Sequence, residues 1–226
     1  MVLPSNSSMK FYPDNTLTSF KTRLQSTISL TGDWEVGLAE IQFPRNWQTI
    51  NRKNRGFTIH SSQGNAYLVL ETGYYNTVQE VVNEMNLCVE NHIYACKDGD
   101  SACWPTFKYD TVSKRVTALV PKQSAIVFNQ RLMAILGFGP EQTQLHNTGA
   151  TTVHHVGSQI SDINEGLYGL YIYCDLLEHV IVGDVEAPLL RVVDASGASG
   201  EIINRIYEKP RYVRFRRNRS TPSSCI

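Results

Sequence analysis

Hydrophobic and polar positions alternate with a period of two along much of this chain, which predicts β-strands more often than helices. The alternation is densest in residues 167–191, where aromatic and β-branched side chains dominate. The turn-forming pair Gly183-Asp184 interrupts this run, and Pro188 ends it. The pattern therefore predicts two successive strands joined by a turn.

The N-terminal part of the chain shows the same periodicity. Residues 34–43 place Trp34, Val36 and Leu38 on one face of a predicted central strand, with a change of face near Glu40. Other alternating runs predict a first strand and five shorter ones. These are residues 16–30, with Phe20, Thr22 and Leu24 on one face, and then 57–60, 67–71, 106–110, 114–120 and 125–128.

Two segments show helical signals. Thr77 and Glu80 have the spacing of a capping box, and the apolar residues that follow recur every three or four positions up to about Glu90: Val78, Val81, Val82, Met85 and Val89. A short helix is expected over residues 130–136, closed by Gly137. The long polar segment of residues 139–158 is interpreted as an exposed loop.

These elements predict an all-β fold, an antiparallel sandwich or barrel with one or two short helical insertions, because no βαβ rhythm occurs. Periodicity alone leaves open a jelly roll, an immunoglobulin-like sandwich and a lipocalin-like barrel. The 226 residues, 42% of them hydrophobic and 19% charged, suit one folded body. We expect a single domain over residues 1–212 and a basic, disordered tail over residues 213–226.

The register predicts a buried face on the strands with the clearest alternation. Its members are Trp34, Val36, Leu38, Leu170, Ile172 and Cys174.

Formal net charge is zero, but residues 201–226 hold seven Lys or Arg against two acids. The N-terminus has no basic segment followed by an apolar run, so no secretory signal is expected. The chain also has no run of about 18 consecutive apolar residues, so no membrane span is expected. Five cysteines, an odd number, indicate thiols of a reducing compartment. We expect an intracellular protein that is not secreted.

Candidate catalytic and metal-binding chemistry is sparse. Cys88, His92, Cys96 and Cys103 could hold zinc, although recognised structural zinc sites use tighter cysteine spacings. Structural roles are favoured for the remaining candidates: loop histidines for His154 and His155, and a core thiol for Cys174. Asp175, Glu178 and Asp184 could be imagined as the paired acids of a hydrolase, but strand-end and turn roles explain Asp175 and Asp184. We therefore expect no enzyme and no cofactor.

The basic C-terminal segment suggests a second class of function. Arginines that could neutralise phosphates alternate there with Tyr212 and Phe215, which could stack on bases. The candidate nucleic-acid contacts are Arg211, Arg214, Arg216, Arg217 and Arg219, together with Arg205. A ligand-binding or carbohydrate-binding jelly-roll module is a further alternative, by analogy of fold alone.

Several sequence blocks, in order over roughly 200 residues, carry a resemblance to a known family. They are residues 3–9, 12–17 with Phe20, 32–44, 136–138, 171–175, 182–184 and 188–191, and the motif residues within them include Trp34, Val36, Leu38, Pro44, Tyr171, Tyr173, Asp175, Gly183, Asp184, Pro188, Leu190 and Arg191. The chain resembles the minor capsid (penton) proteins of Polinton/Maverick elements and their adintovirus relatives.

That resemblance implies a single jelly roll that assembles as a homopentamer at the vertices of an icosahedral virion. A separate double-jelly-roll major capsid protein would build the faces of the shell. The resemblance weakens after Pro210, because the family continues with an acidic alternating stretch and a closing apolar strand, whereas residues 214–226 are basic. We therefore expect an unpaired sheet edge beside the strands of residues 167–193, and a degenerate or host-resident copy.

Overall fold

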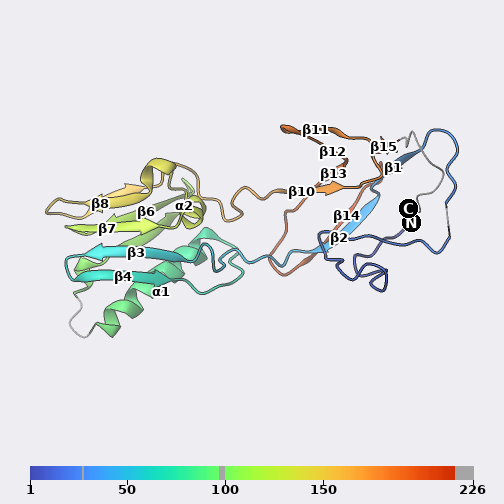
Figure 1. Cartoon of the computed structure of the whole chain (residues 1–226). Coiled ribbons are helices and arrows are strands. Elements are labelled where there is room, and N and C mark those ends of the chain that lie inside the picture. Colours follow the sequence, from blue (N-terminus) through green and yellow to red (C-terminus); the bar gives the residue numbers. More distant parts are fainter. Residues whose placement is uncertain (27, 97–99, 217–226) are drawn as a thin grey trace. The chain divides into compact units, whose positions relative to one another are not determined.

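The computed structural model describes residues 1–26, 28–96 and 100–216, and its chain divides into two compact units (Figure 1). Unit 1 contains residues 1–39, 171–192 and the segment from Tyr207 onwards. Unit 2 contains residues 40–170 and 193–206. The single domain expected over residues 1–212 stays a prediction.

Unit 2 contains the larger antiparallel sheets. A four-stranded sheet has the order β4 (Gly64–Val69), β3 (Gly56–Ser61), β7 (Ser124–Phe128) and β8 (Gln144–Asn147). A three-stranded sheet has the order β5 (Thr106–Asp110), β6 (Arg115–Val120) and β9 (Val153–Val156). The five short strands expected after residue 45 are thus confirmed within three residues at each end, and so is the all-β, antiparallel fold class with two helices.

A hydrophobic core joins these two sheets. Phe57 of β3 and Phe107 of β5 meet edge to face with ring centroids 6.0 Å apart, and Phe128 of β7 lies 6.2 Å from Phe107. Phe128 also stacks on Phe138 at 5.3 Å. Every second side chain of β6 is buried, namely Val116, Ala118 and Val120, as period-two alternation requires.

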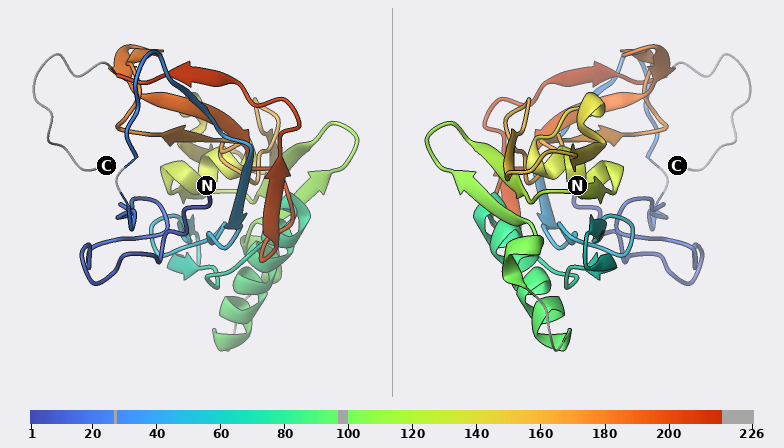
Figure 2. Two further views of the ribbon diagram at one scale, coloured as in Figure 1. Left: turned by 90° about the vertical axis from the view of Figure 1, so that its right-hand side faces the viewer. Right: turned by 90° about the vertical axis from the view of Figure 1, so that its left-hand side faces the viewer.

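Helix α1 (Val78–Ala95), the long green helix of Figure 2, lies against β5 and β4. The predicted start is confirmed, because the Thr77 side chain accepts the Glu80 backbone N–H at 3.2 Å and Glu80 Oε2 accepts the Asn76 N–H at 2.8 Å. All five residues of the predicted apolar stripe are buried. The helix runs about one turn beyond the predicted end at Glu90.

Helix α2 (Gln130–Leu136) has the predicted bounds, and Asn129 caps it by accepting the Arg131 N–H at 3.0 Å. Gly137 ends the helix in the left-handed conformation, with φ of 78°. A Cβ at this position would also lie 2.5 Å from the Gln159 carbonyl oxygen, so glycine is required there for two reasons.

The interpretation of residues 139–158 as an exposed loop is wrong. They contain a 3₁₀ turn (Pro140–Gln142) followed by β8 and β9, which pair with β7 and β6. The polar composition misled because Asn147 is buried, where its amide donates to the carbonyls of Val120, Pro121 and Thr151 at 2.7–2.9 Å. A buried amide whose hydrogen bonds are satisfied can occupy an interior strand position, where an apolar residue is usually found.

The expected central strand over residues 34–43 is also wrong, since it is two strands in separate two-stranded sheets. β1 (Glu35–Gly37) pairs with β15 (Tyr212–Arg214), and β2 (Glu40–Pro44) pairs with β14 (Ile202–Ile206). The break falls at residues 38–39, beside the expected change of face.

The strand expected over residues 16–30 does not form among the described residues of that range, which exclude residue 27. Side chains there bond to nearby backbone, an alternative to a sheet ladder. Asn15 donates to the Lys21 carbonyl at 2.9 Å and accepts the Lys21 N–H at 2.8 Å, and Thr16 accepts the Ser19 N–H at 3.0 Å. Phe20, expected on a shared strand face, is exposed.

The two strands expected in residues 167–191 are four. β10 (Gly169–Tyr173) pairs with β13 (Leu189–Asp194), and between them β11 (Val180–Val182) and β12 (Val185–Ala187) form a hairpin. Gly183, with φ of 65°, opens its two-residue turn. The predicted turn at Gly183-Asp184 is therefore confirmed, while residues 174–179 interrupt what looked like one strand.

Candidate association surface

Unit 1 has many strands and almost no core. Among its described residues only Leu177 is fully buried, whereas unit 2 holds a contiguous core of buried apolar side chains. The burial expected for six residues is not found: Trp34 is 47% exposed, and the other five, Val36, Leu38, Leu170, Ile172 and Cys174, are half-buried. Strands normally bury one face against another layer, so unit 1 has an incomplete hydrophobic interior by itself.

The alternation expected on β10 is present, but the predicted face is only half-buried. Ile172 and the following Cys174 lie on the half-buried side, where burial raises the pKa of the Cys174 thiol. Tyr171 and Tyr173 lie on the opposite, exposed side. Two aromatic rings are thus presented to solvent from a single five-residue strand.

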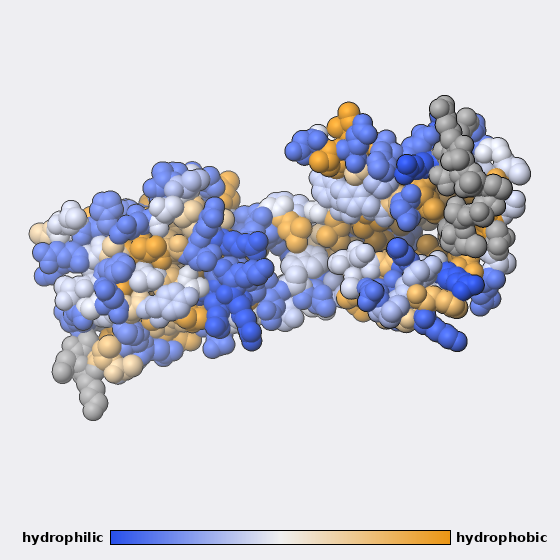
Figure 3. Space-filling view, in the orientation of Figure 1, coloured by the Kyte–Doolittle hydropathy of each residue, from blue (hydrophilic) through white to orange (hydrophobic). Residues whose placement is uncertain are grey.

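The β11–β12 hairpin adds aliphatic side chains to this exposed surface. Ile181 is 79% exposed, and Val180 and Val185 are exposed as well. In the register, Val182 faces Val185 and Ile181 faces Glu186, so the two faces of the hairpin both carry an apolar side chain. Figure 3 shows hydrophobic atoms, in orange, on the outside of this hairpin.

We define the association surface of unit 1 as its exposed apolar side chains on β10, β11 and β12, namely Tyr171, Tyr173, Val180, Ile181 and Val185. Within the described part of the chain, β10 and β13 form a sheet of two strands, and so do β11 and β12. Each strand therefore keeps an edge without a strand partner, in agreement with the unpaired edge expected beside residues 167–193. Such edges offer N–H and C=O groups to another strand.

The expectation of a disordered tail from residue 213 is wrong for residues 213–216. Val213 pairs with Val36, and beyond β15 the Phe215 N–H donates to the Trp34 carbonyl at 3.0 Å. On the other side, Arg216 N–H donates to the Leu176 carbonyl at 2.8 Å, and Glu178 N–H donates to the Arg214 carbonyl at 3.1 Å. Backbone hydrogen bonds on both sides therefore hold residues 213–216 in place.

The strand forms despite its arginines, because the arginines occupy alternate positions. Arg214 and Arg216 are exposed, whereas Val213 and Phe215 are half-buried. The expectation of a degenerate copy rested on the absence of the family's closing strand, and the pairing of residues 213–214 with β1 counts against it. Residues 217–226 lie outside the described residues.

The candidate nucleic-acid contacts divide into three groups. Arg211, Arg214 and Arg216 are exposed, while Arg217 and Arg219 lie outside the described residues. Arg205 already has partners within unit 2, where it donates to Asp194 Oδ2 at 3.0 Å and to the Ser196 carbonyl. Arg214 Nε lies 4.0 Å from Glu35 Oε1, an exposed pair of little energetic weight.

The remaining motif residues lie on strands or turns of both units. Pro44 ends β2, Pro188 separates β12 from β13, and Asp175 follows β10. Leu190 is half-buried on β13, and the next residue, Arg191, stacks on Tyr207 with 3.3 Å between its Cζ atom and the ring centroid. They do not form a reactive cluster, and their role as family motif residues stays a prediction.

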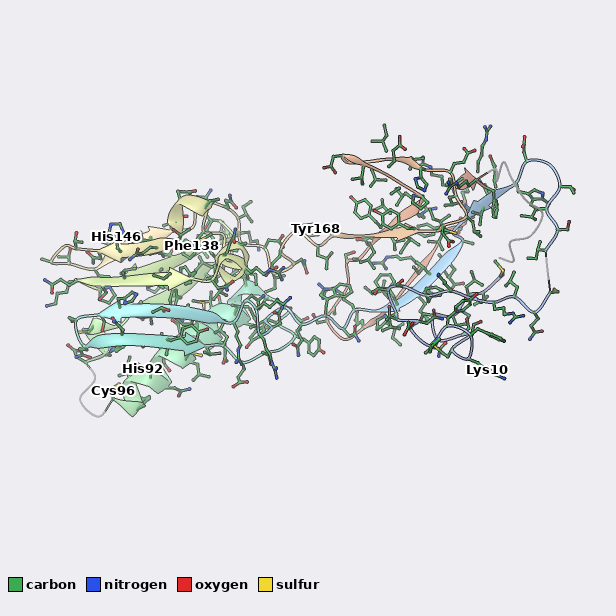
Figure 4. All side chains as sticks on the ribbon, in the orientation of Figure 1. Lys10, His92, Cys96, Phe138, His146 and Tyr168 are labelled. Carbon is green, nitrogen blue, oxygen red and sulfur yellow. The ribbon has the colours of Figure 1, made fainter. Side chains whose placement is uncertain are left out.

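The structure brings only two of the four possible zinc ligands together. Near the end of α1, Cys96 Sγ lies 3.7 Å from His92 Nε2 (Figure 4). Cys88 Sγ instead donates to the Val69 carbonyl at 3.5 Å, and Cys103 Sγ lies 3.8 Å from Asp100 Oδ2. Among the residues that the structure describes, no group of three or more His, Cys, Asp or Glu side chains could hold a metal ion.

The other catalytic candidates are dispersed as well. The expectation of loop histidines is wrong, since His154 and His155 lie on β9, where His155 Nε2 is 3.2 Å from the His146 carbonyl. Asp175 and Glu178 are exposed in the connection between β10 and β11, and Asp184 is exposed in the turn between β11 and β12. No helix in the described ranges is both long and apolar enough to cross a membrane.

The chain was compared with protein families, curated proteins and solved structures. No protein-family profile matches the chain, and no curated protein sequence matches it. The chain is similar to the mavirus penton protein, seen in a crystal structure of its selenomethionine-labelled form, with 13% identity and a TM-score of 0.44 over 85% of this chain and 78% of that chain. It is also similar to a chain of the Sputnik virophage, seen by cryo-EM, with 11% identity and a TM-score of 0.38 over 85% and 79% of the two chains.

Sequence reasoning missed the β11–β12 hairpin as a source of exposed apolar surface. The available signal was Val180-Ile181-Val182 directly before Gly183-Asp184, which is a short β-rich run followed by a turn pair. The exposure of these residues had no sequence signal, because apolar strands are normally assumed to be covered.

Proposed function

We propose that this chain is a self-assembling structural subunit of a capsid, a single-jelly-roll protein of the penton type found in Polinton/Maverick elements. The observation that supports this most is the near absence of buried residues in unit 1. Large exposed patches of apolar side chains mark interaction sites in soluble proteins. Covering them yields about 25 cal/mol for each Å² of apolar surface removed from water.

The occupant of this surface, in our proposal, is a second copy of the same chain. The family resemblance of the sequence blocks supports a ring of five, in which one surface contacts a different surface of the next copy and the contacts close. The ring would occupy the vertices of a virion whose faces are built by a double-jelly-roll major capsid protein. Such a subunit needs neither a catalytic group nor a cofactor.

Substitution of Ile181 tests this proposal. Ile181→Asp places a charge on the association surface, and because the side chain is 79% exposed, the fold of the subunit should survive. Val112→Asp is the matched control, since Val112 is 90% exposed in the β5–β6 turn of unit 2. Sedimentation velocity should show dissociation for Ile181→Asp and unchanged assembly for Val112→Asp. Equal sedimentation of both variants and the wild type would exclude the hairpin from the interface.

A second candidate function, binding of single-stranded nucleic acid, is favoured by one arrangement. Tyr212, Arg214 and Arg216 alternate along one segment and are all exposed, so an aromatic ring and two guanidinium groups share a face. Arg214→Gln with Arg216→Gln should weaken binding of a fluorescent oligonucleotide and reduce its salt dependence. Lys108→Gln with Lys122→Gln, a pair of exposed cations of unit 2, is the control. Equal affinities would count against this function.

A further inference from the structure

Arg45, directly after β2, is a buried cation. Its residue is 9% exposed, although arginine is almost never buried without an anionic partner. Nη1 donates to Ser199 Oγ at 2.9 Å, and Nη2 donates to Asn164 Oδ1 at 2.5 Å. Nε is buried and has no hydrogen-bond partner. The guanidinium also lies over the Trp47 ring, 5.3 Å from its centroid.

The partners of Arg45 are neutral. No carboxylate of the described residues lies within 4.0 Å of its nitrogen atoms, since the ion pairs found there join Arg205 to Asp194 and Arg214 to Glu35. The two neutral acceptors use only two of the five N–H donors of this guanidinium, and the buried Nε–H has no acceptor. The desolvation of such a charge is costly unless an anion compensates it.

The neighbouring acids are occupied by other donors. Glu201 Oε2 accepts the Ala198 N–H at 3.0 Å, and Glu80 Oε2 accepts the Asn76 N–H at 2.8 Å. Asp162 accepts the N–H groups of Asn164 and Gly166 through its two oxygens, at 2.9 and 2.7 Å. These acids hold the loops around Arg45 in place and leave its charge unpaired.

A cavity of about 330 Å³ lies beside this guanidinium, wholly within unit 2. Its walls combine the polar groups of Arg45, Asn76 and Asn164 with the apolar surfaces of Tyr75 and Ile163, and Gly197 and Ala198 complete them. This volume is at the lower end of ligand pockets. Asn76 directly precedes the N-cap of α1, so the positive end of an 18-residue helix lies next to the cavity.

We propose that this cavity binds a carboxylate carried on a short apolar group. The guanidinium fork matches the planar geometry of a carboxylate, and Tyr75 and Ile163 would cover the apolar stem. A phosphate dianion fits less well, because one guanidinium group compensates only one of its two charges. The carboxylate could come from a free organic acid or from a glutamate side chain of a peptide, and both share this chemistry.

Saturation-transfer NMR on the full chain tests the proposal with defined probes. The probes are 3-phenylpropionate and its neutral amide, N-acetylglutamate methylamide and its glutamine counterpart, and inorganic phosphate. We expect both carboxylates to bind and both neutral analogues to bind at least about tenfold more weakly, as loss of a charge-assisted bond predicts. Tighter binding of the free acid or of the acetylated glutamate identifies the source of the ligand.

Three variants locate the binding. Arg45→Gln should weaken binding of 3-phenylpropionate by about tenfold or more, and Arg131→Gln, an exposed arginine at the start of α2, should leave it unchanged. Ala198→Leu fills the cavity from an exposed position, so it blocks binding even if Arg45→Gln fails to fold by circular dichroism. Absence of carboxylate binding, tighter binding of phosphate, or wild-type affinity in Ala198→Leu would each overturn the proposal.

Discussion

The backbone N–H of Phe215 donates to the carbonyl oxygen of Trp34 at 3.0 Å, which joins residues 181 positions apart in the sequence. Together with the Val36 and Val213 pair, this bond fixes the C-terminal segment against the strand that follows the N-terminal loops. Arg216 extends the contact to Leu176 on the other side. The last described residues therefore belong to the fold of unit 1.

Hydrogen exchange should reflect this contact. We expect the amides of Phe215 and Arg216 to exchange more slowly than those of the exposed segment at residues 150–152, because both donate to carbonyl groups. Phe215→Pro removes the donor to Trp34 and should abolish the protection of the segment. Arg214→Gln, which changes an exposed side chain and leaves the backbone donors in place, should keep it. Fast exchange of residues 213–216 in the wild type would contradict the paired segment.

The start of α1 depends on the Thr77 hydroxyl. Thr77→Ala removes the acceptor of the Glu80 N–H and should lower the free energy of unfolding by about 1 kcal/mol without changing the fold. Thr111→Ala, at an exposed turn position, is the control and should change it by less than about 0.5 kcal/mol. Urea unfolding followed by circular dichroism measures both. Equal effects would show that the cap does not stabilise the helix.

The aromatic cluster of unit 2 should dominate its stability. Phe107→Ala removes a buried ring that contacts Phe57 and Phe128 and should cost about 3–5 kcal/mol of unfolding free energy. Tyr94→Ala, at the exposed end of α1, should have little effect. Chemical denaturation of the two variants compares them directly, and a loss below about 1 kcal/mol for Phe107→Ala would contradict the assigned core.

Two groups should make unit 2 sensitive to alkali. Burial, with the nearby Glu84, raises the pKa of the Cys88 thiol from its ordinary 9.0 to about 11, and burial, again with Glu84, raises the pKa of Tyr75 from 10.0 to about 12. A raised pKa in the folded state favours the protonated form. The stabilisation from Cys88 is therefore complete below pH 9 and is lost as pH rises towards 11, and that from Tyr75 is lost between pH 10 and 12.

Thermal unfolding across pH 8–12 measures this loss. Cys88→Ala should flatten the fall in Tm between pH 9 and 11, and Tyr75→Phe should flatten the fall at higher pH. Cys96→Ala, which removes an exposed thiol, is the control. The same fall in Tm with pH in all three variants would contradict the raised pKa values of Cys88 and Tyr75.

The parts of the fold that the sequence predicted correctly are those with local signals. The start of α1 follows from Thr77 and Glu80, the end of α2 from Gly137, and the β5–β6 hairpin from alternation on both sides of a polar turn. In each case the residues that determine the structure lie within a few positions of one another.

Most of the wrong predictions of strands concern pairing between residues far apart in the sequence. Val36 pairs with Val213 and Leu145 with Ile126, and neither relationship has a signature in the nearby sequence. Arg214 looked incompatible with a strand because its exposed position depends on what covers the opposite face. For the same reason, alternation identified the faces of β10 but could not show that unit 1 lacks the layer that would bury Trp34.

The mass of the particle in solution tests the central claim most directly. Size-exclusion chromatography with multi-angle light scattering should give five times the 25.5 kDa mass of one chain, because the surface that unit 1 leaves exposed would then be covered by neighbouring copies. The Ile181→Asp variant should shift the mass towards that of one chain. A stable wild-type particle with the mass of a single chain, at concentrations where the folded protein stays soluble, would contradict the account.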